Sequence, residues 1–125
     1  MTAVKAISDA NAILPGIAAP DNAQDPRWQA IIAIADFVQT DPDPVWTFVA
    51  RWGRHADADL RAAVATCLLE HLLEYHFPLV FPRVEDLVRR DPNFADTFAM
   101  CSKFGQSELP ENASRFDALK AERRR

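Results

Sequence analysis

The tetrapeptide Asp-Pro-x-aromatic occurs three times in this chain of 125 residues, as DPRW at 25–28, DPVW at 43–46 and DPNF at 91–94. Aspartate is favoured immediately before a helix because its carboxylate accepts a hydrogen bond from a free backbone N–H of the first turn. Proline at the next position has no N–H to leave unpaired, and its ring fixes φ at a helical value. We therefore interpret the three tetrapeptides as helix starts with an aromatic side chain facing inward, and DADL at 57–60 as a proline-free relative.

The predicted helix starts follow a regular spacing. Long helices are expected to begin near Pro26, Asp59 and Pro92, at intervals of 33 residues. Shorter helices alternate with them and are expected to begin near Pro44, Pro82 and Pro110. Alternating helices with a constant period of this size are typical of stacked helical hairpins. The sequence therefore predicts an all-α fold, a short right-handed α-solenoid of about three stacked antiparallel helical hairpins.

Apolar residues recur at helical spacing in these segments, and the usual signals of β-hairpins are missing. Residues 57–76, DADLRAAVATCLLEHLLEYH, contain no Gly or Pro and are rich in Ala and Leu, which favour helices. Gly53 follows the apolar face of residues 45–52 and is expected to end that helix. Pro82 is expected to open the next helix in preference to Pro78. In a helix begun at Pro78, the ring of Pro82 would crowd the carbonyl four residues back.

The same features divide the chain into three parts. Residues 1–24 are expected to form an N-terminal extension with a short helix and a loop, residues 25–122 the helical-repeat domain, and residues 123–125 a basic tail. No apolar run approaches the length of a transmembrane helix, and the N-terminal segment has no signal-peptide core. Cys67 and Cys101 each fall within apolar helical spacing, so both thiols are expected to be buried and reduced, as is typical of a cytoplasmic protein.

The net charge restricts the classes of partner. Fourteen Lys and Arg residues against eighteen Asp and Glu residues give a formal charge of −4. A protein that binds phosphate backbones generally presents a basic face, so this balance disfavours nucleic acid as a partner. The three arginines at the end of the chain are too short a run to change that expectation.

The segment DADLRAAVATCLLEHLLE at 57–74 resembles the opening of a HEAT helix, where an acidic residue and Leu precede Arg and small residues. Together with the helix spacing, this makes the chain similar to HEAT-like and armadillo-like helical repeats over about residues 25–122. The resemblance implies a non-enzymatic module that binds other macromolecules along the face of its second helices, here about 44–52, 82–90 and 110–122. A small subgroup of these proteins acts on alkylated DNA, and the acidic balance of this chain departs from that subgroup.

The candidate contact residues lie on those second helices. Aromatic and arginine side chains dominate the binding energy of many protein interfaces. We therefore predict that another protein is bound by Trp46, Arg51, Arg83, Asp86 and Arg90. Phe77, Leu79 and Phe81 crowd the proline-bounded connection. Packing under the neighbouring hairpin or against the N-terminal segment is the favoured arrangement, and an exposed apolar patch that marks a protein interface is the alternative. Arg51 and His55 are also placed to interact with the negative end of the helix at 45–52.

One cluster, EHLLEYH at 70–76, groups metal-competent side chains, at Glu70, His71 and Glu74. The spacing is neither His-Glu-x-x-His nor Glu-x-x-His, so we expect a solvated helix face rather than a metal site. No Gly-rich phosphate loop and no nucleophile elbow occurs in the sequence. We therefore predict no catalytic residue and no cofactor.

Three other functions stay open at this point. A small, acidic, helical protein also fits an immunity-type inhibitor of a cognate toxin, such as a basic nuclease. A nucleic-acid-interacting HEAT-like protein is the second alternative. The third is a metal-dependent enzyme built on Glu70, His71 and Glu74.

Overall fold

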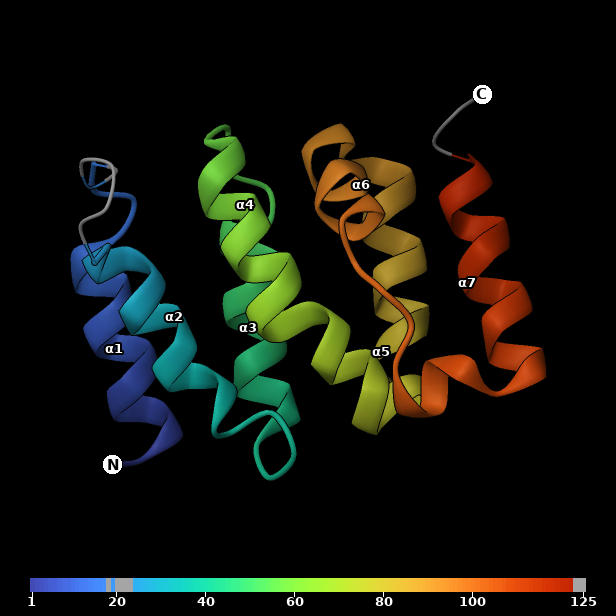
Figure 1. Ribbon diagram of the computed structural model, residues 1–125, viewed down its shortest axis with the longest axis horizontal. Helices are drawn as coiled ribbons and strands as arrows, with labels where there is room; N and C mark the ends of the chain where they lie inside the picture. Colours follow the sequence, from blue (N-terminus) through green and yellow to red (C-terminus); the bar gives the residue numbers. More distant parts are fainter. Residues whose placement is uncertain (18, 20–23, 123–125) are drawn as a thin grey trace.

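A computed structural model describes residues 1–17, 19 and 24–122, and this part of the chain is helical without any strand (Figure 1). The α-helices are α1 (Ala3–Ile13), α2 (Pro26–Ala35), α3 (Pro42–Trp52), α4 (Ala58–Val64), α5 (Glu70–Arg90), α6 (Pro92–Ala99) and α7 (Pro110–Glu122). A π-helical segment, η1 (Ala65–Leu69), joins α4 to α5, and a short 3-10 helix, η2 (Gly105–Glu108), precedes α7. The all-α prediction is confirmed. In the described ranges no helix has both the length and the apolar character needed to cross a bilayer.

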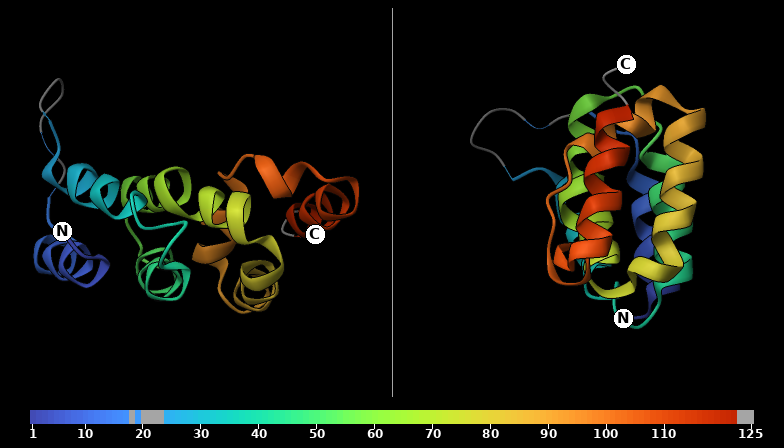
Figure 2. Two further views of the ribbon diagram at one scale, coloured as in Figure 1. Left: turned by 90° about the horizontal axis from the view of Figure 1, so that it is seen from below. Right: turned by 90° about the vertical axis from the view of Figure 1, so that its right-hand side faces the viewer.

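The helices lie in two rows along the length of the molecule (Figure 2). Seen from below, α1, α3 and the second half of α5 form one row, while α2, α4 and the first half of α5 form the other. α1 packs against α2 and α3, α2 packs against α4 and η1, and α3 packs against α5. α7 stands at the far end, in contact with α6 and η2 (Figure 1). Contacts between α1 and α2, between α3 and α4 and between α5 and α6 therefore join helices that follow one another in the chain.

The first helix belongs to the common core. Ala6 and Ala10 of α1 are buried in the same apolar cluster as Ile31, Val49 and Leu72 of later helices. Small side chains on one face allow α1 to approach α2 closely. The segment predicted as an N-terminal extension therefore adds buried surface to the helical array. The predicted basic tail at 123–125 and part of the predicted loop at 15–24 lie outside the described residues.

Three helix starts use aspartate in the predicted way. The carboxylates of Asp25, Asp57 and Asp91 accept hydrogen bonds from backbone N–H groups in the first turns of α2, α4 and α6. The shortest donor–acceptor distances are 2.8, 2.9 and 2.9 Å. The interpretation of DPRW, DADL and DPNF as helix starts is confirmed.

The predicted start at DPVW is wrong by two residues. α3 begins at Pro42, after Asp41, whose side chain makes no capping hydrogen bond, and Asp43 lies in the first turn. The sequence DPDP offers two consecutive Asp-Pro pairs, and the helix takes the earlier one. Pro44 then lies in the first turn, where its missing N–H removes no helical hydrogen bond.

Pro82 does not open a helix. α5 runs from Glu70 to Arg90 and is interrupted only at His76, which has φ −137° and ψ 41°, so Pro82 lies inside the second half. The side-chain amide of Gln106 bridges this break, because it donates to the Tyr75 carbonyl and accepts from the Phe77 N–H, both at 2.8 Å. A distant side chain therefore supplies the hydrogen bonds that the kink removes from the helix.

The close approach of η2 to the break depends on a glycine. Gly105 has φ +51°, a left-handed conformation that non-glycine residues rarely adopt. A Cβ atom there would also lie 2.9 Å from the Glu74 carbonyl oxygen. Gly105 thus allows the following Gln106 to reach the break in α5.

Two of the three residues of the alternative exposed patch are packed in the core, as the favoured interpretation expected. Phe77 and Phe81 are fully buried, and their rings stack with centroids 4.5 Å apart. The second half of α5 turns both rings toward the core, where Phe81 meets the edge of Phe98. Of the three residues, only Leu79 is exposed. The proline-bounded segment is therefore helical core rather than a surface connection.

Candidate functional site

A surface hollow of about 270 Å³ lies between α3 and the second half of α5. The residues that line this α3–α5 hollow are Trp46, Ala50, Arg54, Arg83, Asp86, Leu87 and Arg90. Four of the five predicted contact residues are among them: Trp46, Arg83, Asp86 and Arg90. They are brought together because α3 and the second half of α5 lie side by side in the same row (Figure 2).

Trp46 forms the aromatic part of the hollow. Its ring meets the buried ring of Phe94 edge-on, with centroids 5.9 Å apart and an interplanar angle of 79°. The side chain is half-buried and packs against the core, so one part of the indole is anchored while another part lines the hollow. Such edge-on contacts hold a ring in a defined orientation.

Ion pairs tie the polar side chains of the hollow to its two helices. Arg83 Nη1 lies 2.9 Å from Asp43 Oδ1, which joins α5 to α3. Arg90 Nη2 lies 2.6 Å from Asp86 Oδ2, one turn apart on α5. Exposed pairs of this kind contribute little to stability, so a partner that offers a better-placed charge can exchange for either member.

Arg54 also lines the hollow, and sequence reasoning did not select it. Its Nε donates a 2.8 Å hydrogen bond to the Ala50 carbonyl, one of the last carbonyls of α3. The role expected for Arg51 at this helix end is therefore filled by Arg54. The signal was present in RWGRH, where an arginine follows the glycine that ends the helix.

Arg51 points to a different surface. Its guanidinium carbon lies 4.5 Å from the centre of the Trp52 ring, a cation–π contact. It lines a second hollow of about 570 Å³ between α1 and α3, with Val4, Ile7, Ser8, Asn11, Pro44, Thr47 and Phe48. The structure therefore separates Arg51 from the four predicted contact residues that share the α3–α5 hollow.

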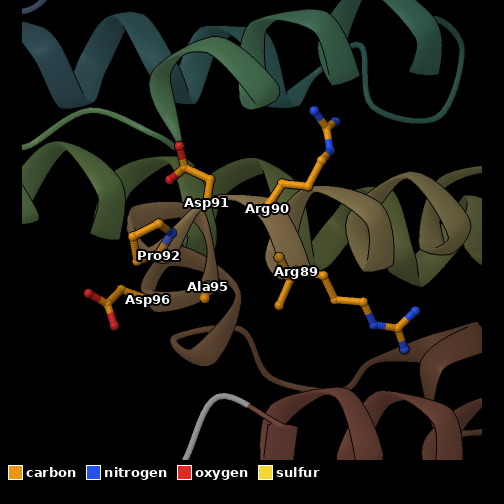
Figure 3. Close-up of a pocket in the computed structure, with 7 residues that line it drawn as sticks. Arg89, Arg90, Asp91, Pro92, Ala95 and Asp96 are labelled. Atoms are coloured by element: carbon orange, nitrogen blue, oxygen red, sulfur yellow. The ribbon is translucent and has the colours of Figure 1, made fainter.

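A third hollow, of about 460 Å³, lies where α5 ends and α6 begins, and Figure 3 shows its labelled lining residues. Arg89 and Arg90 point away from each other, with Arg89 directed toward α7. Arg89 donates to Glu122 of α7 through Nε at 3.0 Å and Nη2 at 2.9 Å. Of the two arginines, Arg89 therefore holds α7 in place while Arg90 lines the α3–α5 hollow.

The cluster at 70–76 does not form the expected solvated face throughout. Glu70 is only 7% exposed, and its Oε2 accepts a 2.8 Å hydrogen bond from the Ser102 N–H. His71 lies between the two carboxylates, with Nδ1 2.7 Å from Glu74 Oε1 and Nε2 3.9 Å from Glu70 Oε1. In the ranges that the structure describes, no three His, Cys, Asp or Glu side chains are arranged to hold a metal ion.

The two cysteines are free thiols. Cys101 is buried and Cys67 is half-buried, and burial raises the pKa of both thiols above the usual range. A raised pKa keeps each sulfur protonated, which disfavours nucleophilic chemistry. Cys101 is buried in the helical core as predicted, whereas Cys67 is only half-buried.

The most heavily paired side chain in the described part of the chain is Arg27, which sequence reasoning also missed. It is 2% exposed, and its guanidinium lies 2.9 Å from Asp57, 2.7 Å from Asp59 and 3.3 Å from Asp25. Its Nη1 also donates to the Pro15 carbonyl at 3.3 Å. The Arg27 cluster, defined as Arg27 with these three aspartates, thus joins the first turns of α2 and α4.

The cluster changes the acidity of its carboxyl groups. Burial acts to raise the pKa of Asp25 and of Asp57, but hydrogen bonds from Arg27 and from backbone N–H groups outweigh it. Both pKa values therefore lie below the ordinary 3.8. The only sequence signal for the cluster is the arrangement of DPR and DAD at two predicted helix starts.

Comparisons with known proteins return no counterpart. No protein-family model, no curated protein and no solved structure matches this chain.

Proposed function

We propose that this chain is a non-enzymatic module of stacked helical hairpins that binds another protein through the α3–α5 hollow. The observation that carries the proposal is the convergence of Trp46, Arg83, Asp86 and Arg90 in one hollow between two helices. Tryptophan and arginine are over-represented among the residues that dominate protein interfaces. Here the indole is anchored on Phe94, and the charged groups surround it.

The arrangement of the helices supports the solenoid part of the proposal. α1 with α2, α3 with α4 and α5 with α6 are contacting pairs, and they follow one another along the array (Figure 1). This pairing includes α1, so the hairpins are offset by one helix from those expected from the 33-residue spacing. Helical repeats that stack in this way expose a row of helices on which partners bind.

The volume of the α3–α5 hollow is close to the lower limit of small-molecule pockets. Pockets for drug-sized ligands and cofactors usually enclose about 300–1,000 Å³. The α3–α5 hollow measures about 270 Å³ and lies open between two helices. It therefore suits one or two side chains that project from a larger surface.

The proposal is tested by affinity capture from the native host with wild-type protein, the double variant Trp46→Ala/Arg90→Ala and the control Lys5→Gln as baits. Lys5 lies on α1 in an exposed pair with Asp9, away from the α3–α5 hollow. We expect one or more proteins to be retained by wild type and Lys5→Gln and lost from the double variant. A captured set that is the same for all three baits would contradict the proposal.

A further inference from the structure

Most Lys and Arg side chains in the described part of this acidic protein form ion pairs. Those without an Asp or Glu partner are Arg51, Arg54 and Lys120, whereas the rest form ion pairs. Lys120 donates to the Cys101 carbonyl, and Arg51 lies over Trp52 outside the α3–α5 hollow. Arg54 is therefore the cation of the α3–α5 hollow that has no acidic partner.

The backbone orients Arg54 for binding. Its Nε hydrogen bond to Ala50 holds the guanidinium at the end of α3, and neither Nη atom has a hydrogen bond within the described residues. A guanidinium presents a planar fork of donors that matches a carboxylate in a two-point contact. Arg54 thus offers an exposed, oriented donor edge at the rim of the hollow.

We propose that Arg54 and Trp46 form a subsite for an Asp or Glu side chain of a partner protein, with an apolar neighbour of that residue resting on the indole. This inference rests on the proposed protein-binding function and names the chemistry that the partner must present. Trp46 lies on α3 and Arg54 lies two residues beyond its last residue, Trp52. Both line the same hollow, so one short segment of a partner reaches them together.

Charge in and around the hollow favours a protein over a nucleic acid. Asp86 lines it and pairs with Arg90, and Asp43 pairs with Arg83 at its edge. These pairs leave Arg54 as the one cation of the hollow without an acidic partner in the described residues, whereas a phosphate backbone is a row of negative charges that is bound by several free cations. A protein segment instead places one carboxylate beside Arg54 and keeps neutral or basic side chains near Asp86 and Asp43.

The inference is tested by panning a phage-displayed library of random 16-residue peptides against the wild-type protein. Enriched peptides are synthesised with a fluorescent label, and their affinity is measured by anisotropy for wild type, Arg54→Gln, Trp46→Ala and Lys5→Gln. We expect the enriched peptides to share an Asp or Glu beside an apolar residue. Their affinity should fall about tenfold or more for Arg54→Gln, because this variant loses a charge-assisted hydrogen bond. Their affinity for Lys5→Gln should stay unchanged.

A matched change in the peptide isolates the contact. Replacement of the shared Asp or Glu by Asn or Gln should weaken binding to wild type by a similar factor and should not weaken binding to Arg54→Gln further. Independent losses at the two sites would overturn the inference, as would enriched peptides without acidic residues or the absence of any enriched peptide.

The outcomes separate this inference from the proposed function. Peptides that bind Arg54→Gln normally but lose affinity for Trp46→Ala would overturn the carboxylate subsite and leave the hollow as a binding surface. The proposed function itself would be contradicted by two results together: peptides whose affinity is unchanged by Trp46→Ala, and a host protein that is still captured by Trp46→Ala/Arg90→Ala.

A labelled 20-nucleotide DNA at low salt is expected not to bind the wild-type protein. DNA binding that is lost in Arg54→Gln would overturn the assignment to protein.

Discussion

Arg27 and Arg54 hold the same functional group in opposite settings. Arg27 is almost fully buried and faces three aspartates at the starts of α2 and α4. Arg54 is exposed at the end of α3 and, within the described residues, has a backbone carbonyl as its hydrogen-bond partner and no acid. The first arrangement consumes every donor of the side chain in holding helices together. The second leaves donors directed at solvent beside an indole.

Buried charge of the first kind stabilises the fold, whereas exposed charge of the second kind is available for binding. A charge taken out of water must be compensated inside the protein, so the Arg27 cluster is a structural element whose members are interdependent. An exposed charge needs no such compensation, and its removal leaves the fold intact. Variants of the two arginines and of their neighbours test this contrast.

Arg27→Ala is expected to lower the free energy of unfolding by about 3 kcal/mol, because it leaves three aspartates without their common cation. Urea denaturation of the variant and wild type measures the loss. The control is Lys5→Ala, which removes one member of an exposed pair and is expected to change stability by less than about 0.5 kcal/mol. A loss below about 1 kcal/mol for Arg27→Ala would show that the cluster contributes little.

Low pH is expected to destabilise the wild type through the same cluster. The loss of free energy of unfolding should be smaller than the loss caused by Arg27→Ala. The carboxyls of Asp25 and Asp57 have pKa values below the ordinary 3.8, so the folded state binds their protons more weakly than the unfolded state does. Their contribution is complete above that value and is lost as the pH falls below it. Thermal denaturation between pH 6 and pH 2 should show a steeper loss for wild type than for Arg27→Ala. Equal slopes would contradict the assignment.

Trp46→Ala is expected to cost about 1 kcal/mol, since the indole is half-buried and makes one edge-on contact with Phe94. The matched control is Phe94→Ala, which removes a fully buried ring and is expected to cost about 3–5 kcal/mol. Thermal or urea denaturation compares the two. If both variants lose the same stability, Trp46 belongs to the core and its place in the binding surface is wrong.

Arg54→Gln is expected to have the smallest effect on folding, a change of less than about 0.5 kcal/mol, because the side chain is exposed and has no acidic partner in the described ranges. Thermal denaturation checks this value. A melting temperature well below that of wild type would place Arg54 with Arg27 as a structural residue and would remove the contrast between them.

Local rules predicted the helices well where one signal acted alone. Asp25, Asp57 and Asp91 cap helices as expected, since capping involves only neighbouring backbone groups. The same rules failed where two signals competed. DPDP contains two equivalent starts, and Pro78 and Pro82 both suit a first turn, so the choice depended on packing. Gln106, about thirty residues further along, supplies the hydrogen bonds that settle the break at His76.

The candidate site was predicted in part. Trp46, Arg83, Asp86 and Arg90 were chosen because they lie on helices expected at one face, and they do share a hollow. Arg51 lies in another hollow, and Phe77 and Phe81 are core. Helical spacing gives the direction of a side chain relative to its own helix. It does not show which other helix packs against that face, so the exposure of these side chains could not be assigned from the sequence.

The helical class of this protein and the starts of most of its helices follow from the sequence, because helix formation and capping depend on residues a few positions apart. Which charged side chains are buried and which are exposed became clear from the packing of the helices. Arg27 meets Asp57 and Asp59 across some thirty residues, and Arg54 meets no acid at all among the described residues. Pairing over such distances depends on how the helices stack, and stacking depends on the summed packing of the whole core rather than on any short segment.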